Sequence, residues 1–166
     1  ATTSWSVGQY PAGLSVNRSS NLLVAYYNSK KIQEYTSAGS LVREITDGNV
    51  LWQALELHDG TLAVVRTGPV HGVCVMSVDG KVLRSYGSTD GSEPGQMDSP
   101  RGAAVDKQGN IIVADFYNNR ILVVNPQLTA ARPLPLPITE MTSPYALWFD
   151  ESRGRLYVGE FGGKQW

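Results

Sequence analysis

Short hydrophobic runs alternate with turn-forming residues along the whole chain, and the same phrase of turn, strand, turn, strand returns several times. The most regular copy runs through residues 99–124, a second through residues 11–35, and a third begins at Pro144. The second hydrophobic run of each repeat contains an equivalent valine: Val24, Val64, Val113 and Val158. Successive valines of this set lie 40, 49 and 45 residues apart. A period of about 40–50 residues is typical of propeller blades.

Each repeat holds four short candidate strands, which predicts an all-β fold: a β-propeller of four-stranded antiparallel blades, about three full and one partial. We expect one domain over residues 1–166, with units at about 10–49, 50–99, 100–143 and 144–166 and a possible closing strand at 1–9. The turn glycines Gly60, Gly80 and Gly109 supply the positive φ of tight hairpins. The interval of 49 residues between Val64 and Val113 is longer because it includes residues 87–95. These residues are rich in turn formers and predict a surface loop.

Composition narrows the function classes. The formal net charge is −1 and charged residues make up 17% of the chain, so the overall field gives no reason to expect a polyanionic partner. Cys74 is the single cysteine, which excludes an internal disulfide and favours a reducing compartment. No hydrophobic run approaches the length of a membrane span. We therefore expect a cytoplasmic protein with no membrane partner.

Residues 94–121 closely resemble the NHL repeat. They place a glycine before a proline-led first strand, an aspartate at its end, a Gly-Asn turn, a strand ending in Ala114-Asp115, and an Asn-x-Arg entry to the third strand at Arg120. The resemblance implies a propeller whose first strand in each blade is innermost. It also implies a recognition module, as in tripartite-motif proteins, that binds protein partners and in several members single-stranded or hairpin RNA. Ubiquitin-ligase activity in such proteins belongs to a RING module, which these residues do not contain.

The loops between second and third strands, together with those joining blades, share one face of a propeller, so this face holds the candidate binding residues. Aromatic side chains interleaved with cations suit both base stacking and protein hot spots. Arg101, at the entry of an innermost strand, is expected near the central opening. Asp115 and Arg120 also have a structural interpretation, as a brace of their turn. The predicted binding residues are Tyr27, Asn28, Lys30, Lys31, Arg66, His71, Arg101, Tyr117, Asn118, Arg120 and Lys164.

Catalysis has little support in the sequence. His58 and His71 are the only histidines, no Cys/His spacing suits a metal, and no phosphate-binding loop occurs, so no cofactor is expected. Three functions stay open in this order: a scaffold for a protein partner, an RNA-binding module, and a calcium-dependent lactonase or lyase of propeller fold. A ring needs more blades than the repeats counted here, so we expect the chain to be part of a longer propeller. A small ring completed by the N-terminal strand, and a ring closed by self-association of two chains, are the alternatives.

Overall fold

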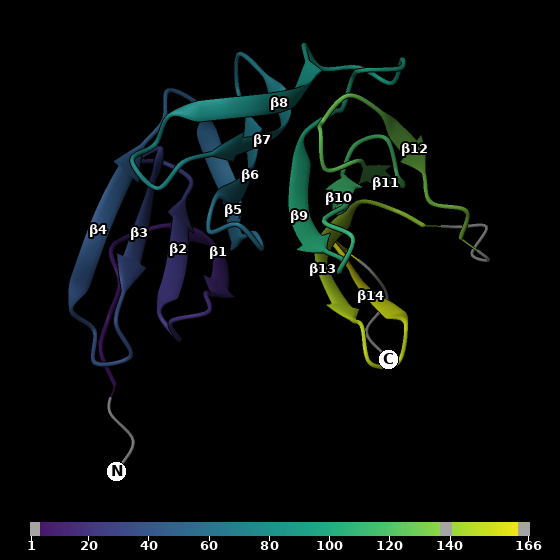
Figure 1. Cartoon of the computed structure of the whole chain (residues 1–166). Coiled ribbons are helices and arrows are strands. Elements are labelled where there is room, and N and C mark those ends of the chain that lie inside the picture. The colour runs from purple at the N-terminus through teal and green to yellow at the C-terminus, as the bar shows by residue number, and fades with distance from the viewer. Residues whose placement is uncertain (1–3, 137–140, 163–166) are drawn as a thin grey trace.

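The computed structural model describes residues 4–136 and 141–162, and within these ranges every regular element is a β-strand. The strands form three antiparallel four-stranded sheets and one hairpin, which we call blades 1 to 4. This confirms the all-β propeller architecture (Figure 1). The strands are β1 (Pro11–Val16), β2 (Leu22–Tyr26), β3 (Lys31–Tyr35) and β4 (Leu41–Thr46) in blade 1; β5 (Val50–Glu56), β6 (Leu62–Thr67), β7 (His71–Met76) and β8 (Val82–Ser88) in blade 2; β9 (Pro100–Val105), β10 (Ile111–Asp115), β11 (Arg120–Val124) and β12 (Ala131–Pro133) in blade 3; and β13 (Pro144–Asp150) with β14 (Arg155–Glu160) in blade 4.

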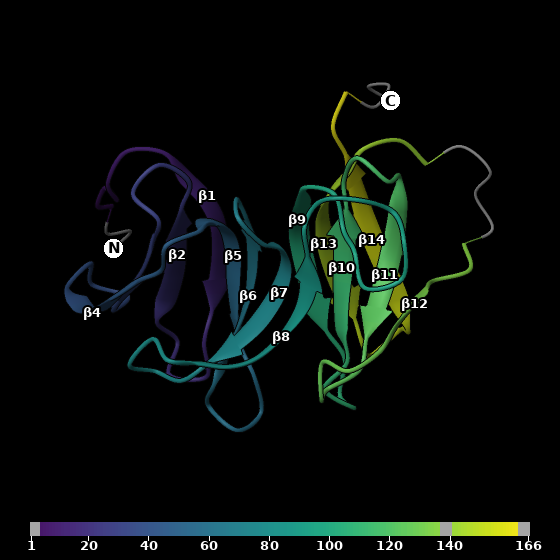
Figure 2. The same ribbon diagram turned by 90° about the horizontal axis from the view of Figure 1, so that it is seen from above.

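The first strand of each blade lies innermost, as expected from the NHL resemblance, and β1, β5, β9 and β13 pack one against the next. Figure 2 shows the blades following one another in chain order. The close approach depends on small residues. A methyl group on Gly13 would collide with the carbonyl oxygen of Trp52 on the neighbouring inner strand. The hairpin turns also have the predicted geometry, since Gly60, Gly80 and Gly109 have φ of 82°, 88° and 81°.

The hydrophobic core is divided among the junctions between blades. Leu23 and Ala25 of blade 1 meet Leu51 and Ala54 of blade 2 in one cluster. Two further clusters join blade 2 to blade 3 and blade 3 to blade 4. The second strands are buried on both faces, which explains why they consist of continuous apolar residues instead of alternating ones. Stability therefore comes from neighbouring blades, as in other repeat proteins.

The segment before β1 lies on the outer half of blade 1 and forms no strand between Ser4 and Gln9. The Trp5 ring packs 5.2 Å from the Tyr35 ring, and its indole N–H donates to the carbonyl of Ser37 at 3.2 Å. The amide of Gly8 donates to the hydroxyl of Tyr26 at 3.3 Å. The predicted closing strand is thus an extended coil in this structure. No helix in the described residues could cross a bilayer.

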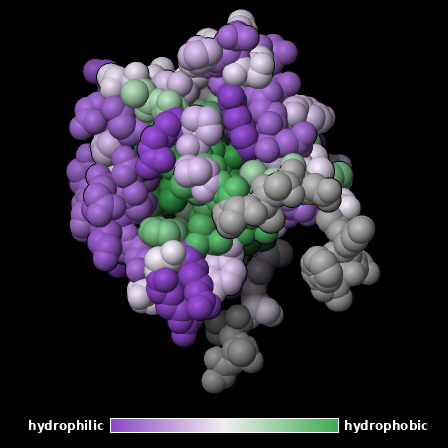
Figure 3. Space-filling view, turned by 90° about the vertical axis from the view of Figure 1, so that its right-hand side faces the viewer, coloured by the Kyte–Doolittle hydropathy of each residue, from purple (hydrophilic) through white to green (hydrophobic). Residues whose placement is uncertain are grey.

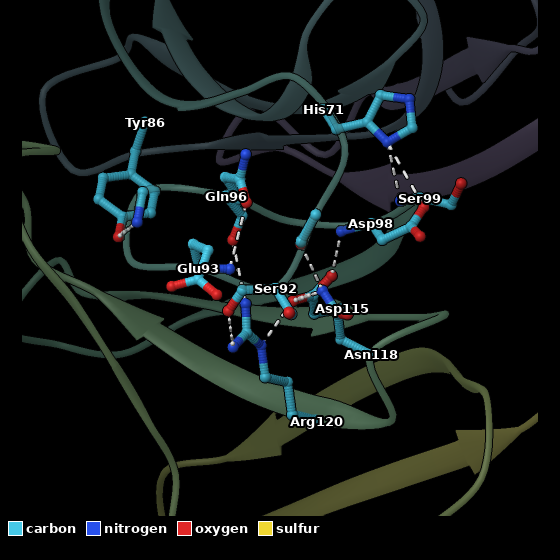
Figure 4. Close-up of polar contacts among 12 residues, drawn as sticks. His71, Tyr86, Ser92, Glu93, Gln96, Asp98, Ser99, Asp115, Asn118 and Arg120 are labelled. Atoms are coloured by element: carbon cyan, nitrogen blue, oxygen red, sulfur yellow. Dashed lines mark hydrogen bonds and ion pairs between the residues drawn. The ribbon is translucent and has the colours of Figure 1, made fainter.

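The loop between β8 and β9 is fastened to blade 3 by Asp115, whose side chain is fully buried (Figure 4). Its carboxylate accepts from the Asp98 amide at 2.7 Å, from Asn118 Nδ2 at 2.9 Å and from Arg120 Nε at 2.7 Å. Arg120 in turn donates to the carbonyls of Ser92 and Gln96, both at 3.0 Å. This network supports the structural interpretation of Asp115 and Arg120.

Candidate binding site

A bulge in each innermost strand turns one side chain toward the propeller axis. Pairing with the second strand is interrupted around Ala12 in β1, Trp52 in β5 and Tyr145 in β13. In β9 the interruption falls at Arg101 and Gly102. A bulge places an extra residue outside the ladder and redirects its side chain. Four equivalent positions therefore converge on the centre, and they line an axial cavity of about 240 Å³.

Arg101 occupies the middle of this convergence. Its guanidinium carbon lies 3.5 Å from the centre of the Trp52 ring and 5.0 Å from that of Phe116. Trp52 is held in place because its indole N–H donates to Thr67 Oγ1 at 2.9 Å. Stacking of a guanidinium on an aromatic face is a favourable cation–π contact.

Aromatic rings surround Arg101 and come from all four blades. The ring of Tyr27 lies 5.0 Å from that of Trp52, and Tyr145 lies 6.3 Å from it. Phe116 contacts Tyr117 at 4.9 Å and Tyr145 at 6.1 Å, and Phe161 lies 6.0 Å from Tyr145. We call this set the axial aromatic cluster; its members are Tyr27, Trp52, Phe116, Tyr117, Tyr145 and Phe161.

The cluster has a buried floor and an exposed rim. Phe116 is buried, whereas Tyr27, Tyr117 and Phe161 are exposed, Tyr117 by 61% of its surface. Large exposed aromatic side chains gathered around one charge are typical of a binding surface.

The charge of Arg101 is not balanced by an ion pair with any described residue. Its Nε atom is buried and has no hydrogen-bond partner there. Burial lowers the pKa of the Arg101 guanidinium, because losing water disfavours its charged form. An arginine nevertheless stays protonated near neutral pH. A half-buried cation with a free donor is suited to an anionic group supplied by a ligand.

Several predicted cations are engaged in interactions within the fold. Lys31 pairs with Glu44 at 3.0 Å. Arg66 is buried and lies 3.5 Å from Asp47. The ring of His71 accepts a hydrogen bond from the Ser99 amide at 3.0 Å.

The remaining predicted residues fall into three groups. Tyr27, Arg101 and Tyr117 lie in or beside the axial cluster, as described above. Asn118 belongs with Arg120 to the network around Asp115. Lys30 and Asn28 are exposed at the β2–β3 turn, where the Lys30 ammonium donates to the carbonyl of Gly48 at 3.0 Å. Lys164 lies outside the described residues.

Four members of the axial cluster were absent from the predicted binding residues: Trp52, Phe116, Tyr145 and Phe161. Trp52 and Tyr145 occupy the same position of the repeat as Arg101: they follow Leu51 and Pro144 as Arg101 follows Pro100. This shared position in the repeat is the sequence signal that identifies them. Phe161 follows a second strand, as Tyr27 and Phe116 do, and shares their place at the turn.

A larger cavity, of about 380 Å³, lies at the opposite end of the axis, where the turns between first and second strands meet. Its carboxylates hold these turns: Glu56 accepts from the Arg18 amide at 2.8 Å, and Asp59 from the Thr61 amide at 3.0 Å. The Arg18 guanidinium also contacts His58. These polar groups are satisfied by the fold, so the axial aromatic cluster is the better candidate despite its smaller cavity.

Comparison with known proteins agrees with this architecture. Residues 97–124 match the NHL repeat. The chain carries an NHL repeat within a β-propeller. Protein brain tumor of Drosophila melanogaster is 26% identical to this NHL propeller over 126 residues, which are 70% of the chain and 12% of that protein. Protein wech of the same organism is 49% identical over 39 residues, 24% of the chain and 5% of that protein.

Solved structures resemble the NHL propeller in fold. A catalytically inactive virginiamycin B lyase from Staphylococcus aureus, crystallised with quinupristin, has a TM-score of 0.69 at 16% identity and is matched over 91% of this chain and 49% of its own. A protein from Bacteroides caccae has a TM-score of 0.62 at 20% identity, with 89% and 52% covered. The NHL propeller thus spans about half the length of these structures.

Proposed function

We propose that this NHL propeller is a non-catalytic recognition module that binds a protein partner through the axial aromatic cluster. The observation that carries the proposal is the unpaired Arg101 guanidinium stacked on Trp52. A carboxylate of the partner, from Asp, Glu or a chain end, is the group that fits this cation.

The physical argument rests on where binding energy is concentrated in protein interfaces. Tyr, Trp and Arg dominate interface hot spots, because they bury a large area at a low cost in side-chain entropy. A carboxylate that reaches Arg101 replaces the water that its guanidinium loses on burial. In this region of low dielectric a charge-assisted hydrogen bond is stronger than at the surface. The exposed rings of Tyr27, Tyr117 and Phe161 then cover the apolar part of the same segment.

RNA binding is the second candidate, since bases stack readily on exposed Tyr and Phe rings. The charge distribution favours protein. A nucleic-acid partner needs several free cations for its phosphates, but Lys31, Arg66 and Arg120 are each paired with a carboxylate. The lyase structures share the fold alone. Within the described ranges, no group of three or more His, Cys, Asp or Glu side chains could hold a metal ion. We rank an enzyme third.

The proposal is tested with an array of peptides of varied sequence, each present in two forms: one with Asp and Glu, the other with Asn and Gln. We expect the purified chain to bind some of the acidic peptides and not to bind the amide forms of the same peptides. Arg101→Gln should weaken binding by about 10-fold or more, the scale of a hydrogen bond to a charged group. Arg132→Gln, which changes an exposed arginine on β12, is the matched control and should bind as the wild type does.

Two results would overturn the proposal. One is unchanged peptide binding by Arg101→Gln. The other is binding of an oligouridine probe with a steep salt dependence while no peptide binds, which would establish the RNA-binding alternative.

A further inference from the structure

One position of the innermost strands holds a small residue in three of the four blades. It directly precedes the residue that pairs with the aligned valine of the second strand, and it is Gly13 in β1, Gly102 in β9 and Ala146 in β13. In β5 it is Gln53. A methyl group on Gly13 or Gly102 would collide with a backbone carbonyl of the next inner strand. The longer side chain in blade 2 shows that the junction between blades 2 and 3 differs from its neighbours.

The Gln53 side chain spans this junction from β5 to β9. Its Oε1 atom accepts a hydrogen bond from the backbone amide of Ala103 at 2.7 Å. A side-chain amide carries one acceptor oxygen and an NH₂ group with two donor hydrogens. Because the Ala103 amide is a donor, it binds the oxygen end of the carboxamide. The NH₂ group is therefore directed away from that amide and is free to donate elsewhere.

The NH₂ group of Gln53 has no hydrogen-bond acceptor among the described residues. Gln53 is half-buried and lines the axial cavity together with Trp52 and Arg101. The Nε atom of Arg101 is buried and unpartnered, whereas Gln53 Nε2 is not among the buried unpartnered atoms. The wall of the cavity thus carries two free donors, one from β5 and one from β9. Polar groups left free in this way call for a partner.

Two contacts keep the Gln53 carboxamide and the Arg101 guanidinium on neighbouring parts of the cavity wall. Trp52, which precedes Gln53 in β5, has its ring centre 3.5 Å from the guanidinium carbon. Ala103, two residues after Arg101 in β9, holds the carboxamide oxygen. Both donors therefore belong to the junction between blades 2 and 3, and blades 1 and 4 lie on either side of this pair.

We propose that Gln53 is the second donor of the carboxylate site: one oxygen of the partner's carboxylate accepts from the Arg101 guanidinium and the other from Gln53 Nε2. This inference rests on the proposed function of the axial aromatic cluster and names the residue that makes the site specific. An ionised carboxylate has two oxygens that only accept, so it satisfies both donors. A neutral amide offers one oxygen and turns its own NH₂ group toward the other donor.

The junctions on both sides of Arg101 are apolar, which strengthens such hydrogen bonds. Val65, Val73 and Met97 belong to the buried cluster between blades 2 and 3. The buried residues between blades 3 and 4 are alanine, isoleucine and leucine, and Figure 3 shows an apolar area on the side of the molecule where β12 and β14 lie. A hydrogen bond to an ionised group is stronger in such surroundings than in water. A carboxylate held by both donors therefore binds more tightly than one held by Arg101 alone.

NMR spectroscopy of the ¹⁵N-labelled chain tests the site with acetate as the probe. We expect the side-chain NH₂ signals of Gln53 and the Nε–H signal of Arg101 to shift along one saturating curve as acetate is added at constant ionic strength. Acetamide, a neutral molecule of the same size, should leave both signals in place. Gln108, an exposed glutamine in a turn of blade 3, is the internal control and should not respond. A shift of Arg101 alone overturns this inference while the proposed function stands, and shifts at neither residue overturn it as well.

Two variants measure the contribution of Gln53 to the binding of acidic peptides. Gln53→Met removes the donor without adding charge and should weaken binding by about 10-fold, the scale of a hydrogen bond to a charged group. Gln53→Glu keeps an acceptor for the Ala103 amide but places a like charge beside the ligand, so it should weaken binding further. Gln108→Glu adds the same charge in an exposed turn and should bind as the wild type does.

The outcomes separate this inference from the proposed function. Acidic peptides that require Arg101 but bind Gln53→Met as tightly as the wild type overturn the inference alone. Binding that Arg101→Gln leaves unchanged overturns the proposed function. Circular dichroism checks that each variant is folded, since Gln53→Met leaves the Ala103 amide without its acceptor. If Gln53→Met does not fold, the acetate titration of the wild type decides.

Discussion

Asp115→Asn should destabilise the protein strongly, although it changes one atom type and keeps the shape of the side chain. The carboxylate accepts three hydrogen bonds at 2.7 to 2.9 Å, one of them from Arg120. An amide at this position can accept on one side only, and its NH₂ group then faces donors on the other. Burial raises the pKa of the Asp115 carboxyl, and its three donors oppose that rise by favouring the ionised form.

The magnitude follows from the burial of the pair. Removing one partner of a buried ion pair costs about 3–5 kcal/mol. The side chain of Arg120 keeps 25% exposure, so water relieves part of the loss and the expected cost is near the lower limit, about 3 kcal/mol. A domain is stable by only about 5–15 kcal/mol. The variant should therefore fold but lose a large part of its stability.

Urea unfolding followed by tryptophan fluorescence measures this cost. With a slope of about 2 kcal/mol per M, the midpoint should fall by about 1.5 M. Asp150→Asn is the matched control: its partner Arg153 is 67% exposed, so the change should cost less than about 1 kcal/mol. Hydrogen exchange should also accelerate in residues 89–99, the loop that the network holds. The reasoning is refuted if the two variants are equally stable, or if exchange in this loop stays as slow as in the wild type.

Two further predictions concern the interior. Gly13→Ala should destabilise the protein by about 1–3 kcal/mol, because the new methyl group collides with the backbone of Trp52. Gly48→Ala is the control and should be nearly neutral, because its methyl group meets nothing within 4 Å. Equal melting temperatures of the two variants would contradict the close packing of the inner strands. Burial raises the pKa of the Cys74 thiol to about 11. Its reaction with Ellman's reagent at pH 8 should therefore be slow in the native protein and fast in urea, and rapid labelling without urea would show that the junction between blades 1 and 2 opens readily.

Much of the fold could be predicted from the sequence, because each blade is specified by local features. Continuous apolar runs such as Leu62–Val65 predict strands buried on both faces, and the turn glycines separate them. The outer strand of blade 3 is limited to Ala131–Pro133, because Pro133 and Pro135 have no amide proton to donate to a neighbouring strand. The region before β1 was harder to predict: its alternating residues suit a strand, but Ser4–Gln9 pairs with none of the described strands.

Less of the binding site could be predicted, because the site depends on contacts between blades. The repeat pattern predicts Arg66 and Arg120 in loops of the binding face, but the structure has them in β6 and at the start of β11, where they pair with Asp47 and Asp115. In each ion pair a carboxylate of the fold neutralises a cation that a ligand could otherwise bind. Whether a charged side chain is free for a ligand thus depends on residues distant in sequence.

The sequence by itself determined the repeat and its strands, since periodicity and turn chemistry are properties of a few neighbouring residues. The innermost place of Pro100–Val105 was implied by the resemblance to the NHL repeat. The tertiary structure alone decided which side chains meet. Bulges in three inner strands, 40 to 50 residues apart, turn Trp52, Arg101 and Tyr145 toward one axis. No local rule specifies that convergence, because it arises from the rotation of each blade relative to the last.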